Sequence, residues 1–228
     1  MDKAETWLKK TLDYRFNDVG LFEQALTHRS APGNSNERLE FLGDAVLDVV
    51  VSEVLYHARP DAAEGDLSRL RASLVRDTSL AELAADLGLG QHVILGSGER
   101  KAGGHRRESI LADALEALFG AVYLDSGFDI ATDFVRRTFG ARFESFPHVD
   151  DLRDPKTQLQ EWMQARGMGL PDYELINVSG KAHQQRFEVQ CTAPDGEATI
   201  GEGTSRRGAE QQSAERMLAQ LTSGDANA

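Results

Sequence analysis

The chain has 228 residues, of which 40% are hydrophobic and 27% charged, the composition of an ordinary globular protein long enough for two domains. No segment approaches the roughly 20 apolar residues of a membrane-spanning helix, and the charged start MDKAETWLKK lacks the apolar stretch of an export signal. The single cysteine, Cys191, excludes an internal disulfide and a cysteine-based zinc site. We therefore expect a cytoplasmic protein without a membrane partner. The net charge of −12 by itself argues against a simple nucleic-acid-binding protein.

The first 146 residues have helical periodicity and no run of alternating strands, so we expect an all-α domain over residues 1–146. The turn-rich segment Ala31–Asn36 offers N-cap side chains to the helix that follows it. Gly96–Glu108 is rich in glycine and basic residues and is expected to be a loop. The spacing of apolar residues predicts helices over Ala4–Tyr14, Val19–Thr27, Glu37–His57, Gly65–Val75, Thr78–Leu87, Ile110–Ser126 and Ile130–Phe143.

The pattern changes after Ser145–Pro155, a polar segment with two prolines, and we place a linker at residues 147–154. Residues 155–224 follow an α-β-β-β-α order, which predicts a second domain of the α+β class. Residues 225–228 are expected to be a disordered tail. The elements of this second domain are helices over Lys156–Arg166 and Arg207–Leu221 and strands over Tyr173–Val178, Gln185–Thr192 and Ala198–Gly203. The last helix is expected to bury Ala209, Ala214, Met217, Leu218 and Leu221.

Acidic residues form a stripe on the helix that begins at Glu37. Glu37, Glu40, Asp44 and Asp48 follow one another at steps of three, four and four, which places them on one face. Most of the other residues of this helix are apolar, so we expect most of it to be buried. Carboxylates that are close together repel one another and are costly beside an apolar surface, unless a cation compensates them.

The helix over Ile110–Ser126 has the same design, because Asp113 and Glu116 lie three apart among apolar residues. Gly43 and Gly120 would let the two helices approach closely. If the acidic faces meet, four carboxylates converge, and such oxygen ligands suit Mg²⁺ or Mn²⁺.

The alternative for either acidic pair is a solvated helix face, which is the common meaning of this spacing. Two such pairs on two apolar helices favour a metal site. Asp48 is interpreted as an edge position that faces solvent or a partner.

The segment NERLEFLGDAVL, which ends at Leu47, closely resembles the signature of the ribonuclease III family. Further segments resemble the family in the same order: LTHRS at Leu26–Ser30, EGDLSRLRASLV at Glu64–Val75 and GGHRRESILADALEALFGAVYLD at Gly103–Asp125. The C-terminal part resembles a double-stranded-RNA-binding domain. Together the two resemblances cover almost the whole chain.

The resemblance implies a homodimeric endoribonuclease that cleaves double-stranded RNA by metal-activated water. The implied products have a 5′-phosphate, a 3′-hydroxyl and short 3′ overhangs, and the implied substrates are precursors of rRNA, mRNA and tRNA. The implied cofactor is Mg²⁺, with Mn²⁺ as a substitute. Phe41 is a candidate for the interface between the subunits. The carboxylates implied to bind metal and to act in catalysis are Glu40, Asp44, Asp113 and Glu116. Those implied to support the cleavage site are Glu37, which is linked to subunit or RNA contacts, and Glu64, which is linked to the surroundings of the site. Capping of the helix N-terminus is a second explanation of Glu37.

The resemblance also implies three groups of RNA-binding residues, suited to the phosphates and 2′-hydroxyls of duplex RNA. They are Gln160, Glu161 and Gln164 on the first helix, His183 in the first strand turn, and Ser205, Arg206 and Arg207 at the start of the last helix. The chain departs from the family here, because the lysine cluster common at this helix start is only Arg-Arg-Gly. Residues 154–228 hold 7 Lys and Arg against 11 Asp and Glu, a net charge of −4.

Two other functions are consistent with parts of the sequence. The first is a double-stranded-RNA-binding protein without catalysis, which the four intact acids argue against. The second is a metal phosphohydrolase of small nucleotides, a class that often has a His-Asp pair; none occurs among the histidines here. This second function would also leave the C-terminal module without a purpose.

Overall fold

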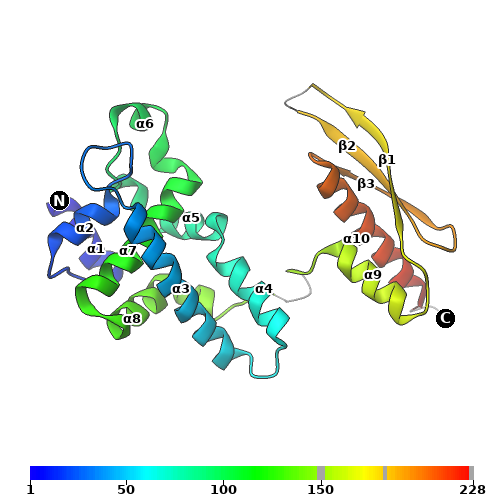
Figure 1. The fold of residues 1–228 in the computed structure, drawn as a ribbon, viewed down its shortest axis with the longest axis horizontal. Coiled ribbons are helices and arrows are strands. Elements are labelled where there is room, and N and C mark those ends of the chain that lie inside the picture. The colour runs from blue at the N-terminus through cyan, green and yellow to red at the C-terminus, as the bar shows by residue number, and fades with distance from the viewer. Residues whose placement is uncertain (148–151, 182–183, 226–228) are drawn as a thin grey trace. The chain divides into compact units, whose positions relative to one another are not determined.

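The computed structural model describes residues 1–147, 152–181 and 184–225, and the chain divides into two compact units, Met1–Val149 and Asp150–Ala228 (Figure 1). Asp154, inside the linker predicted at 147–154, is the N-cap of the first helix of the C-terminal unit. The last helix extends to Asp225, one residue into the predicted tail. Residues 148–151 and 226–228 lie outside the described residues, so the linker and the tail stay predictions.

The N-terminal unit is helical, which confirms the predicted all-α class. In its described residues the only strand-like pairing is an isolated bridge between Thr27 and Ile94. Its α-helices are α1 (Asp2–Leu12), α2 (Val19–Leu26), α3 (Glu37–Ala58), α4 (Glu64–Val75), α5 (Asp77–Asp86), α6 (Ser97–Lys101), α7 (Glu108–Ser126) and α8 (Phe128–Phe139). Short 3₁₀ turns lie at η1 (Leu89–Gln91), η2 (Gly104–Arg106) and η3 (Gly140–Phe143).

The prediction that Gly96–Glu108 is a plain loop was wrong, because this segment contains α6 and η2. An ion pair closes the segment on itself: Arg107 Nη1 lies 2.9 Å from Glu99 Oε1. Gly104 packs against the same acid, since a Cβ added there would lie 2.7 Å from Glu99 Cγ. Contacts of this kind cannot be predicted from the spacing of apolar residues, and the many glycines and charges of the segment favoured a loop.

The end of α8 and the capping of α3 differ from expectation. The helix predicted over Ile130–Phe143 ends at Phe139, because Gly140 takes φ 47° and ψ −124° and interrupts the helical hydrogen bonds. Asn36 stands at the N-cap position of α3, as the turn-rich segment suggested, but its side chain makes no capping hydrogen bond.

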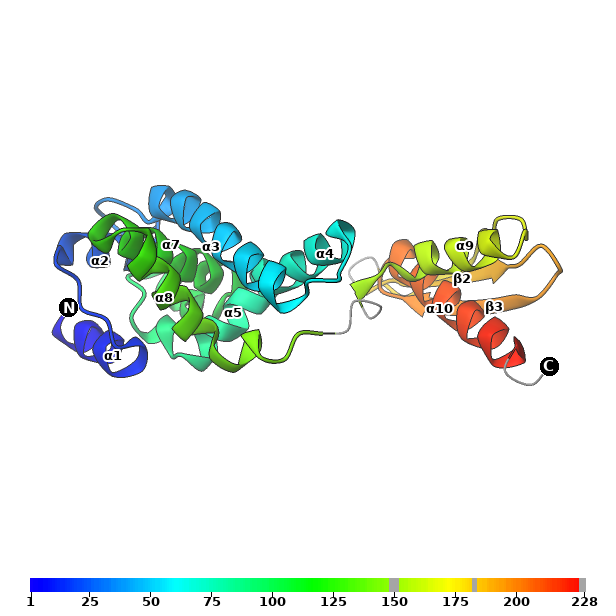
Figure 2. The same ribbon diagram turned by 90° about the horizontal axis from the view of Figure 1, so that it is seen from below.

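Helices α3 and α7 form the centre of the N-terminal unit and lie side by side (Figures 1 and 2). Their backbones touch at two glycines. A Cβ added to Gly43 would lie 1.8 Å from the carbonyl oxygen of Glu116, and one added to Gly120 would lie 2.2 Å from that of Leu39. Real Cβ contacts are never this short, so no other residue fits at either position without moving a helix. The predicted close approach is therefore present.

One face of α3 is open to solvent, which corrects the expectation that most of this helix is buried. Its core face is apolar and includes the fully buried Leu47 and Val50. In contrast, Phe41 is 80% exposed and Val49 54% exposed. Ala45 between them is also exposed. These three residues recur at intervals of four and leave an apolar stripe without a partner in this chain.

The C-terminal unit has the predicted α-β-β-β-α order. Its elements are α9 (Pro155–Ala165), β1 (Asp172–Ser179), β2 (Arg186–Thr192), β3 (Ala198–Gly203) and α10 (Arg206–Asp225). The three strands form an antiparallel sheet in the order β1-β2-β3, with a register shift between Leu175 and Asn177. Both helices lie on one face of the sheet (Figures 1 and 2).

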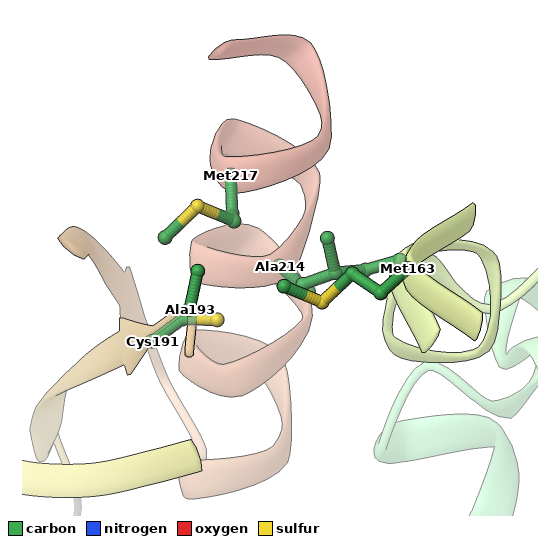
Figure 3. Close-up of a cluster of buried hydrophobic side chains, with 6 residues drawn as sticks. Met163, Cys191, Ala193, Ala214 and Met217 are labelled. Carbon is green, nitrogen blue, oxygen red and sulfur yellow. The ribbon is translucent and has the colours of Figure 1, made fainter. Parts of the chain in front are cut away.

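The core of the C-terminal unit lies between the helices and the sheet (Figure 3). Met163 of α9, Cys191 of β2 and Met217 of α10 are fully buried there, and Met163 points toward Ala214 of α10. Of the face predicted for the last helix, Ala209, Ala214 and Met217 are buried, while Leu218 and Leu221 are partly buried. This core holds the middle of α10 against α9 and the sheet.

Candidate metal centre and nucleic-acid interface

Three carboxylates converge where α3 and α7 are in contact. Glu40 comes from α3, and Asp113 and Glu116 come from successive turns of α7. One oxygen from each lies within 4.8 Å of the others, and all three side chains are half-buried. The glycine contact explains this, because it brings the acidic stripes of two otherwise apolar helices face to face.

The electrostatics of this group are unfavourable without a cation. Burial and the charges of Asp44, Glu40 and Asp113 raise the pKa of Glu116 to about 8. Burial, then Asp113 and Glu37, raise the pKa of Glu40. Each acid thus makes its neighbours harder to ionise.

Asp44 lies at the edge of this group rather than inside it. Four converging carboxylates were expected, but Asp44 is absent from the set of oxygens within 4.8 Å and its side chain is exposed. Its pKa is raised by burial and by Asp48. Of the neighbouring charges, that of Asp44 raises the pKa of Glu116 the most, so Asp44 acts on the group electrostatically from outside the set of three oxygens.

The donor set fits a hard divalent cation. It offers only carboxylate oxygens, which Mg²⁺ and Mn²⁺ prefer. A cation there would offset the repulsion that raises the pKa values of Glu40, Asp113 and Glu116. The described residues therefore support a divalent metal at this position.

Further charges around the acids were not identified from the sequence. Asp77, at the start of α5, raises the pKa of both Asp113 and Glu116. His28 and Arg29 act in the opposite direction on Asp113. These residues come from different parts of the chain, so no spacing rule could have found them. The LTHRS segment was recognised by resemblance, but no role followed from it.

The remaining predicted acids lie outside the three-carboxylate group. Glu37 is exposed, accepts a hydrogen bond from Ser35 Oγ at 2.8 Å, and lies 3.7 Å from Arg29 Nη1. Glu64 is exposed at the start of α4 and accepts a hydrogen bond from Ser68 Oγ at 2.8 Å. Asp48 also stays outside the group, and its Oδ1 lies 3.8 Å from the Nε of an arginine on α4.

The residues predicted to bind RNA are exposed wherever the structure describes them. Gln160, Glu161 and Gln164 lie on α9. Ser205, Arg206 and Arg207 lie at the start of α10, where Ser205 Oγ accepts a hydrogen bond from the backbone N–H of Gly208 at 3.1 Å. His183 lies outside the described residues.

Both units resemble domains of known proteins. A ribonuclease-III-like family model matches residues 18–142, and a double-stranded RNA binding motif matches residues 155–221. Ribonuclease 3 of Alkalilimnicola ehrlichii is 54% identical over 215 residues, 94% of each chain. Ribonuclease 3 of Methylococcus capsulatus is 52% identical over 223 residues, 97% of each chain.

A solved structure supports the fold of the N-terminal unit. The nuclease domain of ribonuclease III from Campylobacter jejuni, described as flexible in a region involved in dimer formation, superposes with a TM-score of 0.59 at 46% identity. The match covers 61% of this chain and 98% of that domain.

The fold and the acidic site define a helical, metal-dependent nuclease unit joined to a double-stranded-RNA-binding motif. The chain belongs to the ribonuclease III family. Among the described residues, no helix is both long and apolar enough to cross a membrane.

Proposed function

We propose that this protein is a homodimeric endoribonuclease that hydrolyses phosphodiester bonds of double-stranded RNA with Mg²⁺. Mn²⁺ would substitute for Mg²⁺. The products would have 5′-phosphate and 3′-hydroxyl ends with short 3′ overhangs, and the substrates would include rRNA, mRNA and tRNA precursors. The observation that carries the proposal is the group of Glu40, Asp113 and Glu116, held together by two helices packed at glycines.

Each carboxylate would have a defined task in this activity. Glu40, Asp113 and Glu116 would hold the metal, and Asp44 would complete the site from its edge. A bound divalent cation supplies charge neutralisation at the phosphate and lowers the pKa of water. The raised pKa of Glu116, about 8, favours its protonated form at neutral pH in the metal-free protein, and the residue would lose this proton on binding a cation. Glu37 would contact the RNA or the other subunit, and Glu64 would support the cleavage site from its surroundings.

The substrate would be held by the C-terminal unit. Duplex RNA is recognised mainly by shape, through phosphates and 2′-hydroxyls. Gln160, Glu161 and Gln164 present polar groups of the kind that contact hydroxyls, and Arg206 and Arg207 are suited to phosphates. The match of residues 155–221 to a double-stranded RNA binding motif supports this assignment.

The dimer would form through the exposed stripe of α3. Phe41, Ala45 and Val49 are apolar and exposed on the helix that also supplies Glu40. An aromatic side chain with 80% of its surface in water is a strong candidate for an interface anchor. Two subunits joined there would provide two acidic sites for the two strands of a duplex. A cytoplasmic location is part of the proposal and agrees with the free, buried thiol of Cys191.

The test is incubation of a duplex RNA with the full chain in Mg²⁺ and in EDTA. We expect cutting of the duplex only with metal, with no cutting of a single-stranded control and no cutting by Glu116→Gln. Binding of the duplex without any cutting in Mg²⁺ or Mn²⁺ would instead favour the RNA-binding protein without catalysis.

A further inference from the structure

The start of α10 carries the arginines expected to meet RNA, but carboxylates of the same unit already occupy them. Arg206 Nε lies 3.0 Å from Glu210 Oε1. Arg207 Nη2 lies 3.6 Å from Asp154 Oδ2. Both arginines therefore have an internal partner where a phosphate would bind.

Glu210 also reaches across to the other helix of the unit. Its second oxygen, Oε2, accepts a hydrogen bond from Lys156 Nζ at 2.6 Å. One carboxylate thus pairs with a cation from α9 and a cation from α10. The side chain of Glu210 is only 15% exposed, and the two cations hold its pKa below the usual range, so it stays ionised.

The arginines themselves remain accessible. The side chain of Arg206 is 60% exposed and that of Arg207 is 80% exposed. A phosphate can therefore reach both guanidinium groups from solvent without disturbing the core. A phosphate must compete for these guanidinium groups with the carboxylates of Glu210 and Asp154.

We infer that Glu210, assisted by Asp154, is an internal competitor of RNA phosphates that sets the affinity of the RNA-binding surface. Binding of a duplex exchanges carboxylate partners of Arg206 and Arg207 for phosphate oxygens. Phosphate binding is therefore less favourable than binding to an unpaired arginine would be, because an existing ion pair must be broken first. The negative charge of Glu210 also stays near the bound phosphates. This inference rests on the proposed function, since it concerns the same surface.

The excess of acidic residues in the C-terminal unit would then have a role in RNA binding. A protein that neutralises fewer phosphates releases fewer counterions, so its RNA affinity depends less steeply on salt. Competition by Glu210 would keep both the affinity and the salt dependence low. The unit would then hold a duplex weakly and release it readily.

The substitution Glu210→Gln tests the inference in the full chain. Glutamine has nearly the same shape, removes the charge, and keeps one carbonyl oxygen, which can accept from one of the two cations that now bind separate oxygens of Glu210. Lys156 also keeps its contact with the ring of Tyr173, whose centroid lies 4.3 Å from Nζ. We therefore expect the variant to fold, which thermal unfolding checks, and Glu210→Ala provides a second variant with the same expected direction.

The matched control is Glu174→Gln, which changes the net charge equally. Glu174 is exposed on β1 and pairs in register with Gln190. It therefore points to the sheet face opposite the one that buries Val189 and Cys191, where the helices pack. A general effect of charge would appear in both variants, whereas competition at α10 appears only at Glu210.

The measurement is binding of a labelled duplex RNA in EDTA at several salt concentrations. We expect Glu210→Gln to bind about three- to tenfold more tightly than the unchanged chain, with a slope of log affinity against log salt steeper by about 1. The control should differ by less than about twofold from the unchanged chain. In cleavage assays with metal, KM should fall while kcat stays the same.

The experiments distinguish a failure of the inference about Glu210 from a failure of the proposed function. If Arg206→Ala with Arg207→Ala weakens binding but Glu210→Gln leaves affinity and salt slope unchanged or lower, the inference is wrong and RNA binding at α10 stands. If the unchanged chain does not bind duplex RNA at low salt, the proposed function itself fails. A structure of the chain with duplex RNA decides the matter without any substitution: both arginines should leave their carboxylates for phosphates, and ion pairs that persist in the complex overturn the inference.

Discussion

Gly43 lies directly against the backbone of Glu116, because a Cβ on Gly43 would come within 1.8 Å of the carbonyl oxygen of Glu116. The replacement Gly43→Ala must push α3 away from α7 and so separate Glu40 from Asp113 and Glu116. We expect a loss of about 1–3 kcal/mol in the free energy of unfolding, the usual cost of overpacking, and a strong loss of cleavage. Chemical denaturation and a duplex-cleavage assay measure the two effects.

The control for this substitution is Gly98→Ala. Gly98 lies in α6, and a Cβ there meets nothing within 4 Å. Its activity should match that of the unchanged protein, and its stability should be equal or slightly higher, because alanine favours a helix over glycine. Equal behaviour of the two variants would contradict the close packing of α3 and α7.

Glu116 should be indispensable for catalysis. The replacement Glu116→Gln removes one anionic ligand from the group of three, and we expect kcat in Mg²⁺ to fall by about 100-fold or more. Glu108→Gln makes the same chemical change at an exposed position of the same helix and should leave the rate unaltered. Duplex cleavage under single-turnover conditions compares them. Full activity of Glu116→Gln would remove this residue from the proposed metal site.

The stability of the metal-free protein should fall as the pH rises. The carboxyl of Glu116 has a pKa of about 8 in the folded chain and about 4.5 as an ordinary glutamate. Between these values the folded state holds a proton that the unfolded state has lost, so folding becomes less favourable as pH increases from about 4.5 to about 8. Glu40, Asp44 and Asp113 have raised pKa values and act in the same direction.

Glu116→Gln should flatten this pH dependence in EDTA. Near pH 8 the variant should be more stable than the unchanged chain by on the order of 1–2 kcal/mol, a value discounted for the partial exposure of the site. Urea denaturation at pH 5, 6.5 and 8 provides the comparison. If the free energy of unfolding changes with pH in the same way in the two proteins, the pKa of Glu116 is not raised in the folded chain.

Phe41 should matter for assembly rather than for folding. Its side chain is 80% exposed in the chain, so Phe41→Ser removes little intramolecular packing. At a dimer interface, loss of such an anchor typically costs about 2 kcal/mol or more. We expect the variant to dissociate at concentrations where the unchanged chain is dimeric, as measured by light scattering. Leu170→Ser, at another exposed apolar position, should remain dimeric. A dimeric Phe41→Ser would place the interface elsewhere.

The sequence was sufficient to predict most of the longer helices and strands and the group of three carboxylates, because helical spacing places Glu40 on one stripe and Asp113 with Glu116 on another. The glycines at 43 and 120 also indicated where these stripes meet. Spacing cannot give the depth of each side chain, so the edge position of Asp44 was missed. Asp77 was missed because α5 reaches α7 only through the tertiary fold.

The C-terminal unit shows the same limit. Arg206 and Arg207 could be located from the sequence, and the acidic balance of the unit could be counted. The pairing of Arg207 with Asp154 joins residues 53 positions apart and depends on how α9 packs against α10. Only the structure shows which carboxylate lies beside which arginine.

The proposed activity depends most on the binding of a divalent cation by the acids of α3 and α7. A crystal of the full chain grown with Mn²⁺ tests this directly, because anomalous scattering locates the ion. We predict a peak bonded to oxygens of Glu40, Asp113 and Glu116, at distances of about 2.0–2.3 Å. Fully occupied Mn²⁺ sites elsewhere on the chain, with no peak among these three carboxylates, would contradict the account.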